Sequence, residues 1–428
     1  MNTPLRLGIA GLGTVGVGLL KIVASQGDRL ARRTGQTIEV TAVSARTRDK
    51  DRGVDISAFA WEDDPVALAR RDDVDIFVEL MGGADGPAKA ATEAAIAAGK
   101  DVVTANKAML ALHGHELAQA AETAGRVIRF EAAVAGAIPC VKALTEGLAG
   151  NEMQRVLGVM NGTCNYILTR MQSAGLSYDE VFAEAEALGY LEADPTLDVG
   201  GIDAGHKLAL LASIAFGTRV NFAGVHLEGI ERVTIDDIEQ AADMGFRVKL
   251  LGVAQLTGRG LEQRMTPCLV PANSPLGRLE NATNMVVLEG DSAGQIVLQG
   301  AGAGQGPTAS AVMSDIADIA RGTRLTTFGQ PAASLVATRA AAASTTAPYY
   351  LRLQLQDKPG ALARIAAVLG EEGISINRMR QYGHEAPQAP VLIVTHKTSR
   401  AALDAACANM DATGVLVGDP VAIRIESV

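Results

Sequence analysis

The stretch Leu5-Arg6-Leu7-Gly8-Ile9-Ala10-Gly11-Leu12-Gly13-Thr14-Val15-Gly16 decides the fold of this chain. Residues 5–10 are typical of a buried strand, and the apolar residues after the glycines favour a helix. A Gly-x-Gly-x-x-Gly turn between a strand and a helix is the arrangement that binds the pyrophosphate of a dinucleotide. Gly11 suits the tight turn, Gly13 lets the backbone approach the ligand, and Gly16 lets the helix pack closely. We therefore predict a Rossmann-type domain whose cofactor-binding residues include Gly11, Gly13, Thr14, Val15 and Gly16.

The second expected strand, residues 38–44, ends in a basic segment rather than in an acidic residue. A site that prefers NAD usually has an acid here, which binds the ribose 2′-hydroxyl. The chain instead reads Ala45-Arg46-Thr47-Arg48-Asp49-Lys50. A guanidinium group pairs with phosphate through two parallel hydrogen bonds, so Arg46 is the candidate for the 2′-phosphate of NADP(H). We expect NADP(H) to be preferred over NAD(H), unless this segment is only a solvated basic loop.

Two further strand–loop units follow, each after an alanine-rich stretch that favours a helix. Residues 74–80 and 101–104 are typical of strands in a parallel sheet. The carboxyl ends of such strands meet at the ligand-binding edge. Thr104 ends one of these strands and Lys107 follows it, so we place both at the cofactor site. An exposed loop lysine is the alternative interpretation of Lys107.

The densest charged segment runs from Gly189 to Lys207, with the sequence Gly-Tyr-Leu-Glu-Ala-Asp-Pro-Thr-Leu-Asp-Val-Gly-Gly-Ile-Asp-Ala-Gly-His-Lys. Its proline and paired glycines indicate a loop, and the apolar residues 208–211 indicate a helix. Asp203 and Lys207 stand at i and i+4, on one face of that helix. A lysine beside carboxylates suits proton transfer and the binding of a substrate ammonium group. A solvated acidic loop with a surface lysine is the alternative.

Between residues 220 and 298 the apolar residues alternate as in strands, for example at 247–254 and 285–288. An antiparallel sheet built from them would pack helices on one face and could join two subunits through the other. The glycine-rich run at 299–308 then opens a helix over residues 309–320. We therefore expect an α+β substrate and dimerisation domain in the middle of the chain.

A low-complexity, alanine-rich segment, residues 339–348, precedes the C-terminal region and is typical of a flexible linker. Beyond it, strands are expected at 349–355, 374–382, 391–396 and 421–426, and helices at 361–372 and 400–410. That order is βαββαβ, the ferredoxin-like arrangement.

The composition excludes several classes of protein. The chain has 428 residues, of which 48% are hydrophobic and 20% charged, as in ordinary globular proteins. Its net charge of −10 argues against a nucleic-acid partner, which usually binds a basic surface. We expect no membrane span and no signal peptide. The four cysteines form no Cys-x-x-Cys pair and are typical of reduced thiols, so we expect a cytoplasmic protein.

Three segments resemble the homoserine dehydrogenase family: Gly189–Lys207, the Thr-Ala-Asn-Lys-Ala run at 104–108, and Asn-Gly-Thr-Cys-Asn-Tyr-Ile-Leu at 161–168. The turn at 357–362 and the Gly-Ile-Ser-Ile-Asn run at 373–377 resemble an ACT domain, an amino-acid-sensing module. The resemblance covers the whole chain. It implies an NAD(P)H-dependent oxidoreductase that reversibly reduces L-aspartate 4-semialdehyde to L-homoserine, in threonine, methionine and isoleucine biosynthesis.

The resemblance implies a role for each candidate site residue. Lys207 is the expected proton donor, and Lys107 is a second catalytic lysine that faces cofactor and substrate. The carboxylates expected to bind the substrate ammonium group are Glu192, Asp198 and Asp203. Two glycines outside the first turn, Gly189 and Gly304, are expected to touch the cofactor, with a glycine hinge as the alternative for the second.

The family also binds a monovalent cation through a glutamate and main-chain carbonyl groups. The matching residues here are Glu131, Val134, Gly136 and Ile138, and oxygen ligands suit a hard cation such as sodium. From the residues alone, an equal alternative is that Glu131 accepts hydrogen bonds from backbone N–H groups.

The expected domains are 1–138 (nucleotide-binding), 139–325 (substrate, with 300–322 returning to the first domain), 326–348 (linker) and 349–428 (ACT). In ACT domains the effector lies against the first loop and the second strand, here Gly360, Ala361, Leu362 and Asn377. L-threonine is the expected inhibitor, and a homodimer or homotetramer is the expected assembly. The alternative is a dimerisation module without a ligand.

Two other functions stay open at this point. Cys164 could be the nucleophile of an acylating semialdehyde dehydrogenase, although such a thiolate needs a neighbouring base or cation. We expect it to be a small structural residue instead. The third hypothesis is a non-catalytic amino-acid sensor with NADP as a structural ligand. The constellation of Glu192, Asp203 and Lys207 argues against it, because a sensor needs no proton donor.

Overall fold

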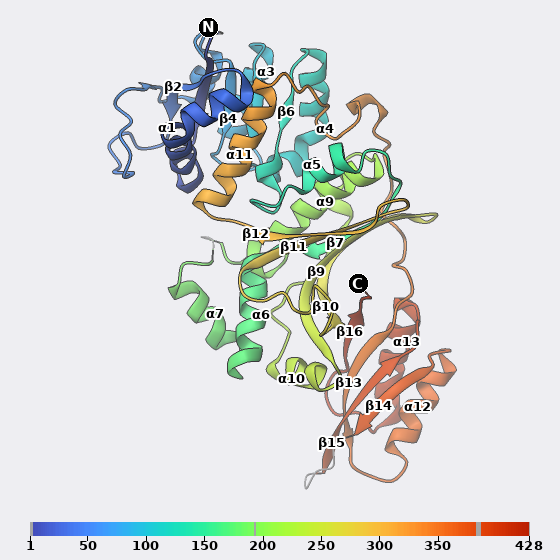
Figure 1. Cartoon of the computed structure of the whole chain (residues 1–428). Helices are drawn as coiled ribbons and strands as arrows, with labels where there is room; N and C mark the ends of the chain where they lie inside the picture. Colours follow the sequence, from blue (N-terminus) through green and yellow to red (C-terminus); the bar gives the residue numbers. More distant parts are fainter. Residues whose placement is uncertain (1–2, 192–193, 382–386, 428) are drawn as a thin grey trace.

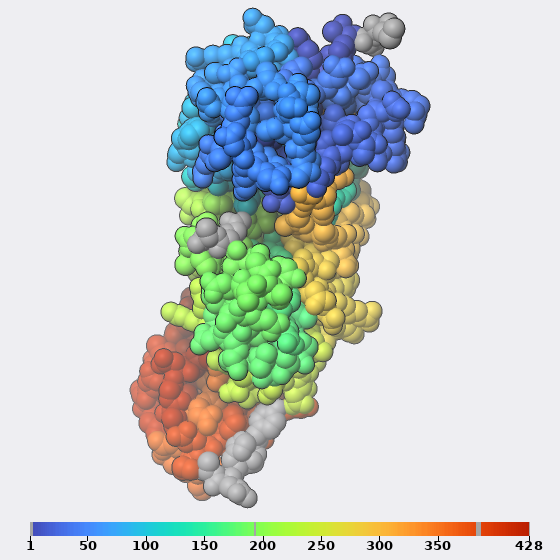
Figure 2. All heavy atoms as spheres, turned by 90° about the vertical axis from the view of Figure 1, so that its left-hand side faces the viewer, coloured from blue at the N-terminus to red at the C-terminus, as the bar shows by residue number. Residues whose placement is uncertain are grey.

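The computed structural model describes residues 3–191, 194–381 and 387–427. The N-terminal domain lies at one end of an elongated molecule, the substrate domain in the middle and the C-terminal domain at the other end (Figure 1 and Figure 2). Within these residue ranges, no helix is long and apolar enough to cross a membrane.

The N-terminal domain is a parallel sheet with the strand order β3-β2-β1-β4-β5-β6, the order of a doubly wound dinucleotide-binding fold. The predicted Rossmann-type domain is therefore confirmed. Its elements are β1 (Leu5–Ala10), α1 (Thr14–Thr34), β2 (Ile38–Ser44), β3 (Ala60–Trp61), α2 (Pro65–Arg70), β4 (Ile76–Glu79), α3 (Pro87–Ala97), β5 (Asp101–Thr104), α4 (Lys107–Thr123) and β6 (Ile128–Arg129).

Helices cover both faces of this sheet, which is why its central strands are buried along their length. Every residue of β4 and β5 is buried. One covering helix, α11 (Gln305–Ala320), follows the substrate domain in the chain and lies against α1 (Figure 1). A Cβ on Gly18 of α1 would lie 2.7 Å from the Gln305 carbonyl oxygen, so glycine sets this close approach.

The substrate domain is built on a largely antiparallel sheet, with α9 lying between that sheet and the nucleotide-binding domain (Figure 1). Leu208 of α9 and Met265 of β10 pack together over Gly252 of β9. The elements of the domain are α5 (Cys140–Lys142), β7 (Met153–Val159), α6 (Gly162–Ala174), α7 (Tyr178–Ala187), α8 (Thr196–Val199), α9 (Ile202–Phe216), β8 (Val225–Leu227), α10 (Ile235–Asp243), β9 (Phe246–Thr257), β10 (Gly260–Pro271), β11 (Thr283–Gly290) and β12 (Gly294–Ala301).

The C-terminal domain has the predicted βαββαβ order, and its strands lie in the order β16-β13-β15-β14. Leu351 and Leu353 of the sheet pack with Ile365 and Leu403 of the two helices in one apolar core. The elements are β13 (Tyr349–Gln356), α12 (Ala361–Glu371), β14 (Ile376–Gln381), β15 (Gln388–Thr395), α13 (Arg400–Met410) and β16 (Val421–Ile425).

The sheets of the substrate and C-terminal domains are one continuous sheet. β16 pairs in parallel with β10, with Cys268 opposite Arg424 and Leu269 opposite Ile425. Beside this seam, Arg264 and Arg424 both form ion pairs with the buried carboxylate of Glu426. A cut between the two domains would therefore remove Glu426 from Arg264, which would keep only its ion pair with Glu262, and would expose an edge of β10.

The alanine-rich segment before β13 is not the flexible linker that its composition suggested. Isolated bridges join Val336 to Thr218, Ala340 to Leu261 and Ala347 to Thr398. The first two backbone pairs fix the segment against the substrate domain, and the third fixes its end to the C-terminal domain. Composition could not indicate this, because the contacts use main-chain N–H and C=O groups that every non-proline residue has.

Candidate active site

The glycine turn between β1 and α1 has the geometry that a dinucleotide requires. Gly11 has φ of 104°, and a Cβ there would lie 2.4 Å from the Leu80 carbonyl oxygen. A Cβ on Gly16 would lie 2.1 Å from the Gly11 carbonyl oxygen. A Cβ on Gly13, by contrast, would meet no atom within 4 Å, so the main chain there is open to a ligand. The helix that begins at Thr14 presents unpaired N–H groups, which favour an anion.

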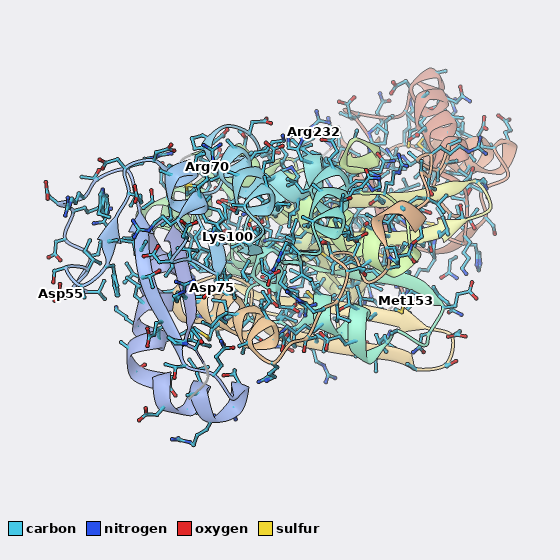
Figure 3. All side chains as sticks on the ribbon, turned by 90° about the horizontal axis from the view of Figure 1, so that it is seen from above. Asp55, Arg70, Asp75, Lys100, Met153 and Arg232 are labelled. Atoms are coloured by element: carbon cyan, nitrogen blue, oxygen red, sulfur yellow. The ribbon has the colours of Figure 1, made fainter. Side chains whose placement is uncertain are left out.

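A cavity of about 580 Å³ opens beside this turn and extends to the loop after β2. Arg46, Lys50 and Arg52 line it. The Arg52 guanidinium donates to the carbonyl oxygens of Leu12 and Lys50, at 3.3 and 2.8 Å, and so ties the loop to the glycine turn. Figure 3 shows Asp55, farther along this loop, at the outer edge of the domain. The cavity thus combines the glycine turn with a cationic rim.

Glu79, a buried carboxylate that our sequence reasoning missed, organises the same sheet edge. Its Oε1 accepts hydrogen bonds from the N–H groups of Met81 and Gly82, at 2.8 and 3.1 Å. Its Oε2 accepts one from the Thr104 hydroxyl at 2.6 Å. The hydroxyl of Thr104 therefore joins β5 to β4 in the interior of the domain. The one signal for Glu79 in the sequence was an acid at the end of an apolar strand.

Lys107 and Lys207 meet on one carboxylate, between the nucleotide-binding and substrate domains. Lys207 Nζ lies 2.6 Å from Asp203 Oδ2, and Lys107 Nζ lies 2.8 Å from Asp203 Oδ1. Lys107 begins α4, whereas the other two residues belong to α9. Lys207 Nζ also donates to the Met160 carbonyl oxygen at 2.9 Å. Helical spacing indicates the pair within α9, but only the fold brings Lys107 to it.

The two lysines keep Asp203 ionised. The side chains of Asp203 and Lys207 are 7% and 11% exposed, and that of Lys107 is 31% exposed. Burial acts to raise the pKa of Asp203, but the charges and hydrogen bonds of Lys207 and Lys107 outweigh it and hold that pKa well below its usual value. Both oxygens of Asp203 are thus engaged by lysines, and its binding of the substrate ammonium group stays a prediction.

Asp198 lies beside Asp203, and one amide group contacts both carboxylates. Asn161 Nδ2 donates to Asp198 Oδ1 at 2.9 Å and to Asp203 Oδ2 at 3.3 Å. Glu192, the third expected ammonium ligand, lies outside the described residues. The site as described therefore contains two carboxylates, two lysines and one amide.

Gly189 and Gly304, both expected at the cofactor, have positive φ values of 73° and 116°. The first follows α7, and the second immediately precedes α11. These conformations require glycine for backbone reasons alone.

Cys164 lies in the first turn of α6 and is fully buried. Its thiol donates to the Asp198 carbonyl oxygen at 3.3 Å. Burial, reinforced by the charges of Asp198 and Asp203, raises the pKa of Cys164 well above its ordinary value. A nucleophilic thiolate needs the opposite environment, so the geometry disfavours the acylating mechanism.

Glu131 forms the backbone hydrogen bonds that the sequence left open as an alternative. Its carboxylate accepts from the N–H groups of Val141 and Lys142, at 2.9 and 2.8 Å, at the start of α5. Burial, reinforced by the charge of Asp315, raises the pKa of Glu131 to about 7.

The main-chain oxygens expected to join Glu131 as cation ligands lie in a sharply bent loop. Gly136 has φ of 56°, and its neighbour Ala135 has φ of 54°. The carbonyl oxygens of Val134 and Ile138 both accept hydrogen bonds from Cys140, from its thiol at 3.7 Å and its N–H at 2.8 Å. Among the residues that the structure describes, no group of three or more His, Cys, Asp or Glu side chains is placed to hold a metal ion.

The expected effector residues lie in the C-terminal domain. Gly360, with φ of 84°, is the N-cap of α12, and Ala361 and Leu362 form its first turn. Asn377 is exposed on β14, which is the edge strand of the continuous sheet.

The parallel sheet with its open glycine turn, together with two lysines on one buried carboxylate, defines a nicotinamide-dependent dehydrogenase. Three family models match the chain: "Homoserine dehydrogenase, NAD binding domain" over residues 11–131, "Homoserine dehydrogenase" over 139–317 and "ACT domain" over 349–406. The chain belongs to the homoserine dehydrogenase family.

Individual relatives agree with the family models. A homoserine dehydrogenase of Neisseria gonorrhoeae is 42% identical over 432 residues, which cover 99% of each chain. The crystal structure of a homoserine dehydrogenase from Thiobacillus denitrificans has a TM-score of 0.93 and 38% identity, with 99% of each chain covered. A hyperthermophilic archaeal homoserine dehydrogenase in complex with NADPH has a TM-score of 0.62 and 26% identity over 74% of this chain and 97% of its own.

The predicted enzyme class is thus confirmed. The chain is an oxidoreductase that interconverts L-aspartate 4-semialdehyde and L-homoserine with a nicotinamide dinucleotide.

Proposed function

We propose that Lys207 is the proton donor of this reaction and that Lys107 orients the aldehyde oxygen of the substrate. The observation that carries this proposal is that both ammonium groups lie within 2.8 Å of the same carboxylate, that of Asp203. The shared carboxylate holds the two ammonium groups next to each other. N–H donors placed in this way stabilise an oxygen on which negative charge develops.

The bound nicotinamide supplies a hydride to the aldehyde carbon when the cofactor is present. Negative charge then develops on the aldehyde oxygen, and Lys207 Nζ passes a proton to that oxygen to give the alcohol. The Met160 carbonyl and Asp203 accept hydrogen bonds from Nζ and hold it in place. Lys107, the more exposed lysine, stabilises the same oxygen. Kinetics of Lys207 and Asp203 variants test these roles: turnover must fall while NADPH binding persists.

The substrate ammonium group is proposed to bind Asp198. Asp203 is already engaged by the lysines, and Asp198 is the other carboxylate of the described site. Glu192, which lies outside the described residues, stays in the proposal on the ground of its sequence motif.

NADP(H) is the proposed cofactor, with Arg46 as the group that recognises its 2′-phosphate. Arg46 lines the same cavity as Gly11 and Gly13 of the glycine turn. Lys50 adds a second cation to that wall, and the archaeal relative is named as a complex with NADPH. Gly189 and Gly304 stay proposed cofactor contacts.

Replacing Arg46 with alanine is expected to weaken NADPH binding by about tenfold to a hundredfold, because a hydrogen bond to a charged group contributes about 1.5–3 kcal/mol. NADH lacks the 2′-phosphate and should bind nearly unchanged. Fluorescence titration with each nucleotide measures both constants. An exposed arginine of the C-terminal domain, Arg400, provides the matched control as Arg400→Ala. Equal weakening of NADPH and NADH in Arg46→Ala would show that the basic loop does not discriminate.

L-threonine is the proposed effector of the C-terminal domain, at Gly360, Ala361, Leu362 and Asn377. Millimolar L-threonine is expected to inhibit the full-length enzyme, and couplings of this kind correspond to about 5- to 150-fold changes. Calorimetry should detect binding that Asn377→Ala weakens. Asn409→Ala, which removes the amide that donates to Glu372 on the same domain, is the control and should bind as the wild type does. Absence of both binding and inhibition would remove threonine from the proposal.

A sodium ion at Glu131, Val134, Gly136 and Ile138 completes the proposal. The described geometry offers one buried carboxylate and a bent, carbonyl-bearing loop, which is a donor set for a hard cation. A homodimer or homotetramer and a cytoplasmic location are proposed with it, the latter because the four cysteines are free thiols.

A further inference from the structure

Asn161 connects the carboxylates of the active site, and the roles proposed above assign it no task. We propose that Asn161 is a positioning residue: its amide group holds Asp198 and Asp203 side by side, so that Asp203 aligns Lys207 while Asp198 faces the substrate ammonium group. The inference rests on the roles proposed above for Lys207 and Asp198.

The side chain of Asn161 is buried, and both ends of its amide are engaged. Oδ1 accepts the N–H of Cys164 at 2.8 Å and thereby caps α6. Nδ2 donates one hydrogen to Asp198 and one to Asp203. Rotation of the amide by 180° would turn Oδ1 toward two carboxylates and Nδ2 toward a donor. The amide therefore has one acceptable orientation, which fixes the directions of both acids.

Met160 and Asn161, which follow β7, form hydrogen bonds with both members of the Asp203–Lys207 pair. Met160 accepts a hydrogen bond from Lys207 through its carbonyl group, and Asn161 donates one to Asp203 through its amide. An i, i+4 pair on a helix surface is otherwise free to sample several rotamers. Here Met160 holds Lys207 and the next residue, Asn161, holds Asp203, so this freedom is removed. A proton donor requires such a fixed position.

An amide is the suitable group at this position because two carboxylates lie next to it. A hydroxyl has one hydrogen to donate, whereas an NH2 group has two and adds no charge. The titratable groups around the amide come from α8 (Asp198), α9 (Asp203, His206 and Lys207), α4 (Lys107, through Asp203) and the loop before α10 (Glu231, whose charge acts on Cys164). The hydrogen-bond acceptors of Nδ2 are Asp198 and Asp203.

Two substitutions separate the positioning task from the capping task. Asn161→Ser keeps an oxygen that can cap α6, since serine and asparagine are about equal as N-caps. It replaces the NH2 group, which donates to both carboxylates, with a shorter group that has a single hydrogen to donate. Asn161→Asp keeps the shape and the capping oxygen but directs a third carboxylate toward Asp198 and Asp203. The control is Asn221→Ser, because Asn221 also caps a helical turn, at Gly224, but its amide donates to the Thr338 carbonyl group and not to a carboxylate.

We expect Asn161→Ser to raise the KM for L-homoserine by about tenfold or more, with a smaller loss of kcat and a nearly unchanged melting temperature. In Asn161→Asp the loss should depend on pH. Neighbouring negative charges raise the pKa of an introduced carboxyl group, so this group regains a proton, and with it a donor, as the pH falls. The kcat/KM of this variant relative to wild type should therefore rise between about pH 8 and about pH 6.

A purely structural role would give a different pattern. Wild-type KM and kcat in Asn161→Ser would overturn the proposal. So would parallel losses of activity and melting temperature in both variants, with a relative kcat/KM that is flat with pH. If Lys207→Met also retains turnover, the proposed function fails together with it; if Lys207→Met is inactive while the Asn161 variants behave as wild type, only the positioning role fails.

Discussion

Replacing Lys207 with methionine is expected to lower kcat by about 10²–10⁴-fold, the usual consequence of losing a general acid. Methionine fills much of the same buried volume but carries no proton to donate. NADPH binding should stay within about twofold of wild type, because the glycine turn and Arg46 lie in another domain. Stopped-flow measurement of NADPH oxidation, together with nucleotide titration, gives both quantities.

The control for this variant is Lys89→Met. Lys89 forms an i, i+4 ion pair with Glu93 on α3, as Lys207 does with Asp203 on α9, but the Lys89 pair lies on the surface of the nucleotide-binding domain. Loss of an exposed pair of this kind changes stability by less than about 1 kcal/mol and should leave turnover intact. Turnover of Lys207→Met within a few-fold of this control would contradict the assignment of the proton donor.

Asp203→Asn should lose both turnover and stability. The exchange leaves two neighbouring ammonium groups without their shared counter-charge, and breaking a buried ion pair from one side typically costs about 3–5 kcal/mol. We expect the lower end of that range, since Lys107 is 31% exposed and can turn toward solvent. Urea unfolding at neutral pH measures the free energy of unfolding.

The difference in the free energy of unfolding between wild type and Asp203→Asn should become smaller as the pH falls. The lysines hold the pKa of Asp203 in the folded state below its value in the unfolded chain, which is about 3.9. The ionised carboxylate therefore stabilises the fold at full strength above about pH 5, and this contribution declines as the pH falls toward the folded-state pKa.

Asp404→Asn is the matched control, because Asp404 pairs with Arg400 on the exposed side of α13. It should change the free energy of unfolding by less than about 1 kcal/mol at any of these pH values. An Asp203→Asn variant as stable as this control at neutral pH would show that the two lysines do not depend on Asp203.

Local sequence was sufficient wherever the chemistry lies within one turn of the chain. Gly11 and Gly16 stand where neighbouring backbone atoms leave no space for a side chain, and Gly13 stands where the main chain is open to a ligand. The spacing of these three glycines predicted the domain. Asp203 and Lys207 were predicted as a pair because helical spacing fixes their separation. The βαββαβ order was likewise evident from apolar periodicity.

Contacts between distant segments could not be predicted from local patterns. Lys107 contacts Asp203 from another domain, and Asn161, which follows β7, contacts Asp198 of α8. The three acids appeared equivalent as ammonium ligands, although the fold engages Asp203 with lysines. Glu79 was overlooked because two of its partners are main-chain N–H groups, which leave no sequence signal, and the third, the Thr104 hydroxyl, belongs to another strand.

The join between the substrate and C-terminal domains was the least predictable part. Alanine-rich composition suggested a flexible linker, yet backbone pairing fixes the segment, and β16 continues the sheet beside β10. Parallel pairing between residues as far apart in the chain as Cys268 and Arg424 has no local signature. The C-terminal domain is therefore physically continuous with the sheet on which α9 lies.

The central claim is that a lysine pair, and not a thiol, carries the reduction. The most direct test is an assay with L-aspartate 4-semialdehyde and NADPH in phosphate-free buffer. The protein is used as wild type, Cys164→Ser and Lys207→Met, and both nucleotide oxidation and L-homoserine are quantified. We predict equal amounts of NADPH consumed and L-homoserine formed by the wild type and by Cys164→Ser, with Lys207→Met nearly inactive. The account would be contradicted if the wild type formed no L-homoserine in this assay but reduced NADP⁺ once NADP⁺ and phosphate replaced NADPH, with that activity absent in Cys164→Ser.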